Sequence, residues 1–168
     1  MQLYDITVPY LDKSLRNVGS WIDKAHEHAT AKKVDPNTML TARLAVDQYP
    51  LLRQVQSVCD QPKLLLFRCA FKEAPTHPDT ETTWDELKTR IASVRELING
   101  FKPGDFDESK LIELPFFAGK KLRMVDYVVE FALPNFNFHL VTTYALFRHL
   151  GVELGKKDFI GGLPFLEA

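Results

Sequence analysis

Apolar residues recur at helical spacing along most of the chain. The first run is spaced alternately by four and three residues, the pattern of one buried helix face about five turns long. It comprises Leu11, Leu15, Val18, Ile22, Ala25 and Ala29. A later helix is expected to begin near Asp47 and to end around Phe71. Another should follow the capping box at residues 83–86 and stop at Gly100.

Shorter elements fill the gaps between these runs. Asp35 followed by Pro36 predicts a capped short helix that extends to about Arg43. Residues 111–114 and 121–124 flank Ala118-Gly119 and predict a small β-hairpin. Residues 126–150 form the last predicted helix, and its expected core-facing residues are Val128, Val129, Phe131, Phe138, Val141, Ala145 and Leu146. Pro134 is expected to interrupt this helix.

Four long helices joined by loops predict an all-α fold, an up-and-down four-helix bundle with a small β-hairpin before the last helix. Residues 1–168 contain no linker or internal repeat, so they are expected to form a single domain. The loop at residues 73–80 contains two prolines, and His77 within it is expected to be solvated. Bundles of this kind bind ligands where facing helices converge.

Composition excludes several classes of partner. The chain has 21 Lys and Arg residues against 22 Asp and Glu residues, which gives a formal net charge of −1. This balance lacks the basic excess that nucleic-acid binding requires. No apolar run is long enough to span a bilayer, so no membrane partner is expected and a cytoplasmic location is the default prediction. Cys59 and Cys69, if they share a helix, lie too far apart for a disulfide.

Three polar residues are the candidates for chemistry. Asn135 and His139 are four residues apart and project from one face of the last predicted helix. Neighbouring phenylalanines would desolvate the imidazole and favour its neutral form, which can act as a base or a ligand. Asp47 has two interpretations: it caps the helix that begins near it, or its carboxylate points towards His139.

Several segments carry a resemblance to a known family. They are Leu3 to Asp5, Ala42 to Leu51, Asp79 to Thr83, Phe131 to His139 and Gly151 to Phe159. With these segments the chain resembles the domain of unknown function 1993 family, a branch of the DinB/YfiT-like superfamily. The resemblance spans nearly the whole chain, and its last two segments are the most specific.

The resemblance implies a DinB-like four-helix bundle that is often a homodimer. The superfamily includes metal-dependent thiol transferases and isomerases that use cofactors such as mycothiol or bacillithiol. Its typical members hold a divalent metal with three histidines. On this sequence the pair spaced by four falls on Asn135 and His139, and the third position falls near Asp47. Only one of the three is a histidine here, which weakens the affinity for zinc or nickel.

Three uses of these side chains remain open. Asp47, Asn135 and His139 hold one divalent metal (manganese, iron, nickel or zinc), or they perform acid–base chemistry without one, or they form a hydrogen-bonded structural cluster. In the second case His139 is the base, Asp47 fixes its tautomer and Asn135 orients a substrate oxygen. With or without a metal, the chain is in the first two of these cases a transferase, isomerase or hydrolase acting on a small apolar or aromatic metabolite. The alternative is a non-catalytic small-molecule-binding or scaffold protein that has lost the metal triad.

Overall fold

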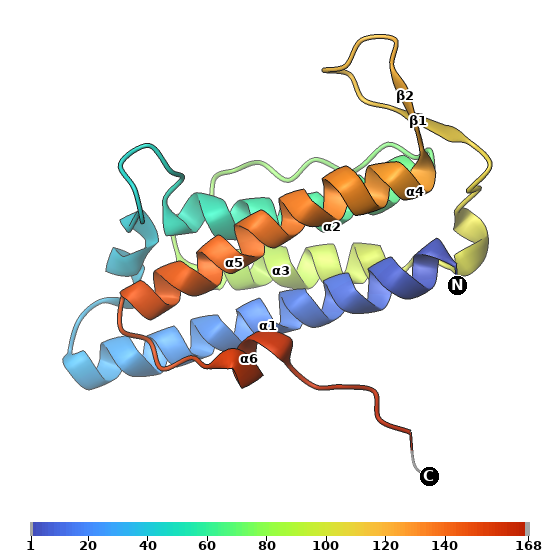
Figure 1. The fold of residues 1–168 in the computed structure, drawn as a ribbon. Helices are drawn as coiled ribbons and strands as arrows, with labels where there is room; N and C mark the ends of the chain where they lie inside the picture. Colours follow the sequence, from blue (N-terminus) through green and yellow to red (C-terminus); the bar gives the residue numbers. More distant parts are fainter. Residues whose placement is uncertain (1, 167–168) are drawn as a thin grey trace.

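The computed structural model describes residues 2–166 and places four long helices side by side (Figure 1). The last of these helices consists of three consecutive segments. The helical elements are α1 (Leu3–Lys32), the 3-10 helix η1 (Pro36–Thr41), α2 (Leu51–Cys69), α3 (Trp84–Asn99), the 3-10 helix η2 (Pro103–Asp105), α4 (Met124–Asp126), the π-helical segment η3 (Tyr127–Ala132), α5 (Leu133–His149) and α6 (Lys156–Ile160). Within residues 2–166, no helix combines the length and apolarity needed to cross a membrane.

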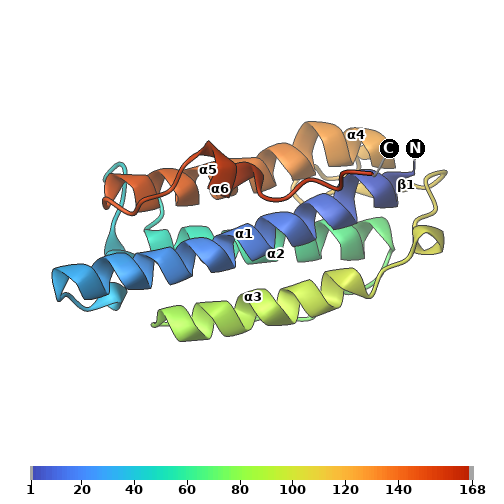
Figure 2. The same cartoon turned by 90° about the horizontal axis from the view of Figure 1, so that it is seen from below.

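The helix directions depart from strict alternation at one point. Asp60 on α2 pairs with Arg90 on α3, and three residues further along both helices Lys63 and Ser93 contact the same side chain, that of His77. Helices α2 and α3 therefore run in the same direction, and the loop that joins them returns along the length of the bundle (Figure 1). Seen from below, α5 and α3 lie on opposite sides of α1 (Figure 2). The four long helices run up, down, down and up.

The periodic runs found in the sequence explain α1 and α3. All six residues of the first predicted stripe are fully buried, and they lie along the middle of α1. The capping box that begins α3 is confirmed, with Glu86 accepting from the backbone nitrogen of Thr83 at 2.9 Å. Asp35 caps η1 as predicted, with its side chain accepting from the backbone nitrogen of Asn37 at 2.9 Å.

The prediction for the core-facing residues of the last helix is only partly confirmed. Val128 and Leu146 are buried as predicted, but Val129, Phe138 and Val141 are exposed, and Phe131 and Ala145 are only partly buried. The buried face also carries Tyr127, Ala132, Phe136, His139, Leu140, Thr142, Thr143 and Phe147. The cause is helical geometry, because at about 100° per residue Phe138 and Val141 lie on a different face from Val128 and Leu146. The helix also winds as a π-helix in η3, just before Pro134. Because the wider turn accommodates a proline without its N–H donor, Pro134 does not interrupt the helix.

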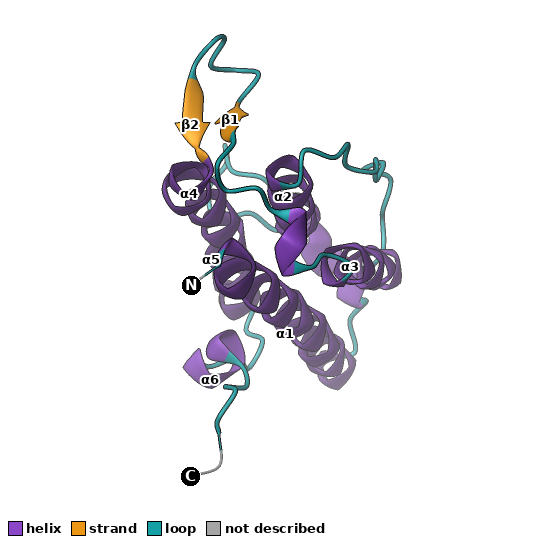
Figure 3. Cartoon of the chain, turned by 90° about the vertical axis from the view of Figure 1, so that its right-hand side faces the viewer, coloured by secondary structure: helices purple, strands orange, loops and turns teal. Residues whose placement is uncertain are grey.

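The core lies between the four long helices, and its largest fully buried side chains include Trp21, Trp84, Tyr127, Phe136 and Phe147. The predicted hairpin is confirmed: β1 (Leu111–Glu113) pairs antiparallel with β2 (Lys121–Arg123). It projects from the side of the bundle, next to α4 (Figure 3). Helix α6 is held against α1, because Trp21 donates to the backbone oxygen of Asp158 at 3.1 Å.

Candidate functional site

His139 lies on the face of α5 that packs against α2, and only 9% of its surface is exposed. Its Nδ1 atom is 2.8 Å from the side-chain oxygen of Gln54, in the first turn of α2. The amide nitrogen of Gln54 donates to the backbone oxygen of Tyr49, so the amide oxygen faces the imidazole. Because an amide oxygen only accepts, Nδ1 of His139 carries the hydrogen.

In this neutral tautomer the other ring nitrogen of His139, Nε2, carries no hydrogen and presents a lone pair. Among the described residues, none hydrogen-bonds to Nε2, and Nε2 is not one of the side-chain atoms buried without a partner. Solvent therefore reaches it. Burial, followed by the positive charge of Arg53, lowers the pKa of His139 below its usual value. The ring is consequently neutral at pH 7, with an available basic nitrogen.

Aromatic side chains surround the imidazole. The ring of Tyr49 is parallel to that of His139 within 10°, with centroids 6.5 Å apart. The ring of Phe138 meets it edge to face at 5.3 Å. Tyr49 and Phe138 are each about half exposed, at 52% and 54%. The buried base thus borders a partly exposed aromatic surface.

Asn135 lies one helical turn before His139, as the spacing predicted, and is half-buried. Its side chain makes no hydrogen bond with any other residue between 2 and 166. The amide is therefore available to a ligand. Of the three candidate residues, these two share a helix face.

Asp47 lies in an exposed turn, and the helix that was expected to begin near it begins at Leu51. The residue at the N-cap position of α2 is Pro50, so the prediction that Asp47 caps this helix is wrong. The physical reason is Pro50, which disfavours helical backbone at Tyr49 and separates the turn from α2. The Asp47 carboxylate makes no hydrogen bond or ion pair with another described residue, His139 included.

The donor groups present do not fit a catalytic divalent metal. No group of three or more His, Cys, Asp or Glu side chains is placed to hold an ion in the described part of the chain. Asn135 offers a neutral amide oxygen, a weak ligand compared with imidazole. Cys59 and Cys69 are unpaired, as predicted, and burial raises the pKa of each thiol to about 12, so neither is a nucleophile at neutral pH.

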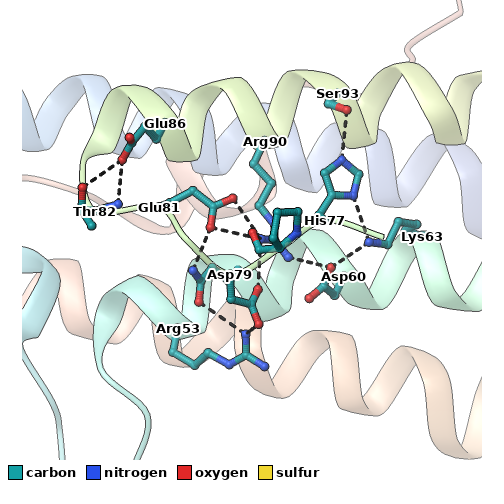
Figure 4. Close-up of polar contacts among 12 residues, drawn as sticks. Arg53, Asp60, Lys63, His77, Asp79, Glu81, Thr82, Glu86, Arg90 and Ser93 are labelled. Carbon is teal, nitrogen blue, oxygen red and sulfur yellow. Dashed lines mark hydrogen bonds and ion pairs between the residues drawn. The ribbon is translucent and has the colours of Figure 1, made fainter. Parts of the chain in front are cut away.

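A second polar cluster lies between α2, α3 and the loop that joins them (Figure 4). At its centre, the Arg90 side chain is 1% exposed and pairs with Glu81 at 2.9 Å, Asp60 at 2.8 Å and Asp79 at 3.0 Å. Buried Lys63 contacts Asp60 at 3.0 Å. We call this cluster the Arg90 network; it comprises Arg90, Asp60, Lys63, His77, Asp79 and Glu81.

His77 joins the Arg90 network instead of being solvated, so that prediction is wrong. Its Nδ1 atom is 3.0 Å from the Lys63 ammonium, and its Nε2 atom is 3.1 Å from the Ser93 hydroxyl. Because an ammonium only donates, Nδ1 must accept and Nε2 must carry the hydrogen. Burial first, and then the charges of Lys63 and Arg90, lower the pKa of His77. Both of its nitrogens are engaged, unlike those of His139.

Arg53 connects the two clusters. It forms an ion pair with Asp79 of the Arg90 network. Its guanidinium carbon lies 5.7 Å from the centroid of the Tyr49 ring, beside His139. Neither Arg53 nor Gln54 was identified as a site residue from the sequence.

Two surface pockets lie along α1. One, of about 590 Å³, is lined by residues that include Tyr10, Lys13, Arg16 and Leu163. The other, of about 530 Å³, is lined by residues that include Lys24, His28, Lys32 and Gly151. Neither is lined by any of the three candidate residues, so the expected ligand site at His139 is separate from both.

Known proteins place the chain in a family. A family model described as a domain of unknown function (DUF1993) matches residues 3–160. A crystal structure of a DinB family member protein from Shewanella denitrificans is 43% identical in sequence, with a TM-score of 0.94 over 99% of this chain and 96% of that chain. No curated protein matches the chain significantly. The family match and the shared helical fold show that the chain belongs to the domain of unknown function 1993 family, among the DinB-like proteins.

Proposed function

We propose that this protein binds a small apolar or aromatic metabolite and uses His139 as a proton acceptor in its isomerisation, dehydration or hydrolysis. The observation that carries this proposal is the hydrogen bond between Nδ1 of His139 and Gln54. It selects the tautomer in which Nε2 is the basic nitrogen, and a fixed tautomer is what general base catalysis requires. The lowered pKa keeps Nε2 unprotonated at pH 7.

In this proposal each side chain has one task. Nε2 of His139 takes a proton from the substrate or from a water that attacks it. Gln54 remains bonded to Nδ1–H and holds the ring in place, which is the task first assigned to Asp47. Asn135, whose amide is unpaired by other described residues, orients a substrate oxygen. No step is assigned to a metal, because the donor groups do not fit one.

One observation favours the non-catalytic alternative. The partner of His139 is a neutral amide and not a carboxylate, so it stabilises an imidazolium less than a carboxylate would. A small-molecule-binding or scaffold protein needs no such stabilisation. The two functions therefore differ in whether Nε2 of His139 reacts.

Chemical modification tests the availability of Nε2. Diethyl pyrocarbonate acylates neutral, accessible imidazoles, and peptide mass spectrometry at pH 7 measures the rate at each histidine. We expect His139 to react faster than His77, because both nitrogens of His77 are engaged. Equal rates, or modification of His77 alone, would contradict the proposal.

Hydrolysis of 4-nitrophenyl acetate tests whether this nitrogen performs chemistry. We expect the wild-type protein to hydrolyse this ester faster than the His139→Gln variant does, and to lose no activity in EDTA. Loss of activity in EDTA, together with bound manganese, iron, nickel or zinc in untagged protein, would instead support a metal enzyme. Equal rates for the two proteins would favour the non-catalytic alternative.

A further inference from the structure

Arg53 places a positive charge at the edge of the His139 site. It precedes Gln54 on α2, and its guanidinium lies over the Tyr49 ring at 5.7 Å. The Arg53 side chain is 36% exposed, so an incoming molecule can reach it. A guanidinium presents a planar fork of donors that matches a carboxylate in two parallel hydrogen bonds.

The present partner of Arg53 can be replaced without leaving a buried charge unpaired. Asp79 pairs with Arg53 but also with buried Arg90, at 3.0 Å. If another carboxylate takes its place on Arg53, Asp79 keeps Arg90 as its counterion. The exchange takes place at a partly exposed ion pair, which contributes little to stability. The second polar contact of Arg53, with the Gln56 side-chain oxygen at 3.4 Å, is also compatible with a ligand.

An apolar surface lies next to this charge. The Tyr49 ring is close to both the Arg53 guanidinium and the His139 imidazole, and Phe138 packs against that imidazole on α5. Both aromatic side chains are half exposed, and burying their exposed area against a ligand is favourable. The site therefore combines one exposed cation, an aromatic surface and one basic nitrogen.

We propose that Arg53 determines the substrate class of the His139 site, which takes a small organic carboxylate with an apolar or aromatic body. The carboxylate binds the Arg53 guanidinium in place of Asp79, and the body lies on Tyr49 and Phe138 near Nε2 of His139. This inference rests on the proposed function and adds a specificity residue to it.

A matched pair of probes tests the inference. Phenylacetate and phenylacetamide share an apolar body and differ in charge, and binding of each is followed by the NMR signals of the His139 ring. We expect phenylacetate to bind roughly tenfold more tightly than phenylacetamide, as a charge-assisted hydrogen bond to arginine predicts. Inorganic phosphate serves as a third probe, because it carries charge without an apolar body.

Three variants locate the effect. We expect Arg53→Gln to remove the preference for phenylacetate, and Asp79→Asn to strengthen phenylacetate binding severalfold by removing the competing carboxylate. Arg16→Gln is the matched control, because Arg16 is a surface arginine that pairs with Asp12 on α1. It should bind both probes as the wild type does.

The inference is overturned if phenylacetate does not bind, if both probes bind equally, or if phosphate binds as tightly as phenylacetate. It is also overturned if Arg53→Gln and Arg16→Gln behave alike. In each of these cases the reactivity of His139 towards diethyl pyrocarbonate still stands as a separate measurement. Failure of the inference is thereby distinguished from failure of the proposed function.

Discussion

Two polar clusters contact α2, and they differ in whether their groups are paired. In the Arg90 network, each charged side chain has at least one oppositely charged neighbour, and both nitrogens of His77 are engaged, although Nε of Arg90 is buried without a partner. At the His139 site, Nε2 and the amide of Asn135 have no partner among the described residues. Paired charges contribute to structure, and a buried unpaired atom is out of reach of a ligand, whereas the solvent-accessible Nε2 of His139 can bond to one. This difference is why we place function at His139.

The largest predicted effect is the loss of the central cation from the Arg90 network. Arg90→Met leaves Asp60 and Glu81 as partly buried carboxylates without their main counterion. We expect the free energy of unfolding to fall by about 3–5 kcal/mol, measured by urea denaturation. Arg95→Met on the same helix is the matched control, because Arg95 forms a partly exposed pair with Asp12 and should cost at most about 1 kcal/mol. Similar losses for both variants would show that the Arg90 network is not a stabilising unit.

Removal of the acceptor at His139 should have an intermediate effect. Gln54→Leu leaves the buried Nδ1–H without its partner, so we expect a loss of about 1–3 kcal/mol in the free energy of unfolding. Gln61→Leu, on the same helix and without a side-chain hydrogen bond to another residue between 2 and 166, is the control and should stay within about 0.5 kcal/mol. If the two leucine variants are equally stable, Gln54 does not hold His139.

Acidification should lower the free energy of unfolding through a histidine in each cluster, over the same pH range. The pKa values of His77 and His139 lie below the usual value of 6.5 in the folded protein, so the unfolded chain binds protons first as the pH falls. We therefore expect the free energy of unfolding to decrease from pH 6.5 downwards until the folded-state pKa values are reached. Urea denaturation at pH 7 and pH 5 measures this decrease in the free energy of unfolding. The decrease should be smaller in His77→Gln than in the wild type. A stability that is constant over this interval would contradict both lowered pKa values.

The smallest effect is expected at Asp47. Its carboxylate is exposed and unpaired by other described residues, so Asp47→Ala should change the free energy of unfolding by less than about 0.5 kcal/mol. Asp35→Ala is the matched comparison, because Asp35 caps η1 and its loss should cost about 1 kcal/mol. Thermal denaturation measures both variants, and a larger loss at Asp47 would reveal a structural role for it.

Much of the fold follows from the sequence because it depends on local patterns. The stripe of α1, the capping box of α3 and the hairpin each lie within one short segment and are confirmed. The core face of the last helix was predicted only in part, because the exposed face of α5 also carries apolar residues, Phe138 and Val141, while Val128 and Leu146 are buried as predicted. The direction of α3 was also missed, since it depends on the path of the loop before it.

The candidate site was only partly predictable, because its contacts join distant segments. The pair Asn135 and His139 follows from helical spacing alone. Gln54 lies three residues after Leu51 and four before Val58, so it falls on the buried face of α2. A polar residue at a core position was the signal for it. Arg90, between Leu87 and Val94 on α3, carried the same signal.

The central claim is that Gln54 holds His139 as the neutral tautomer with a free Nε2, and long-range ¹H–¹⁵N NMR spectra measure this directly. At pH 7 we expect Nδ1 of His139 to be protonated and Nε2 to show the shift of a lone-pair nitrogen, with a titration midpoint below 6.5. In Gln54→Leu, this tautomer preference should be lost. A wild-type ring protonated on Nε2, or a midpoint at or above 6.5, would contradict the claim.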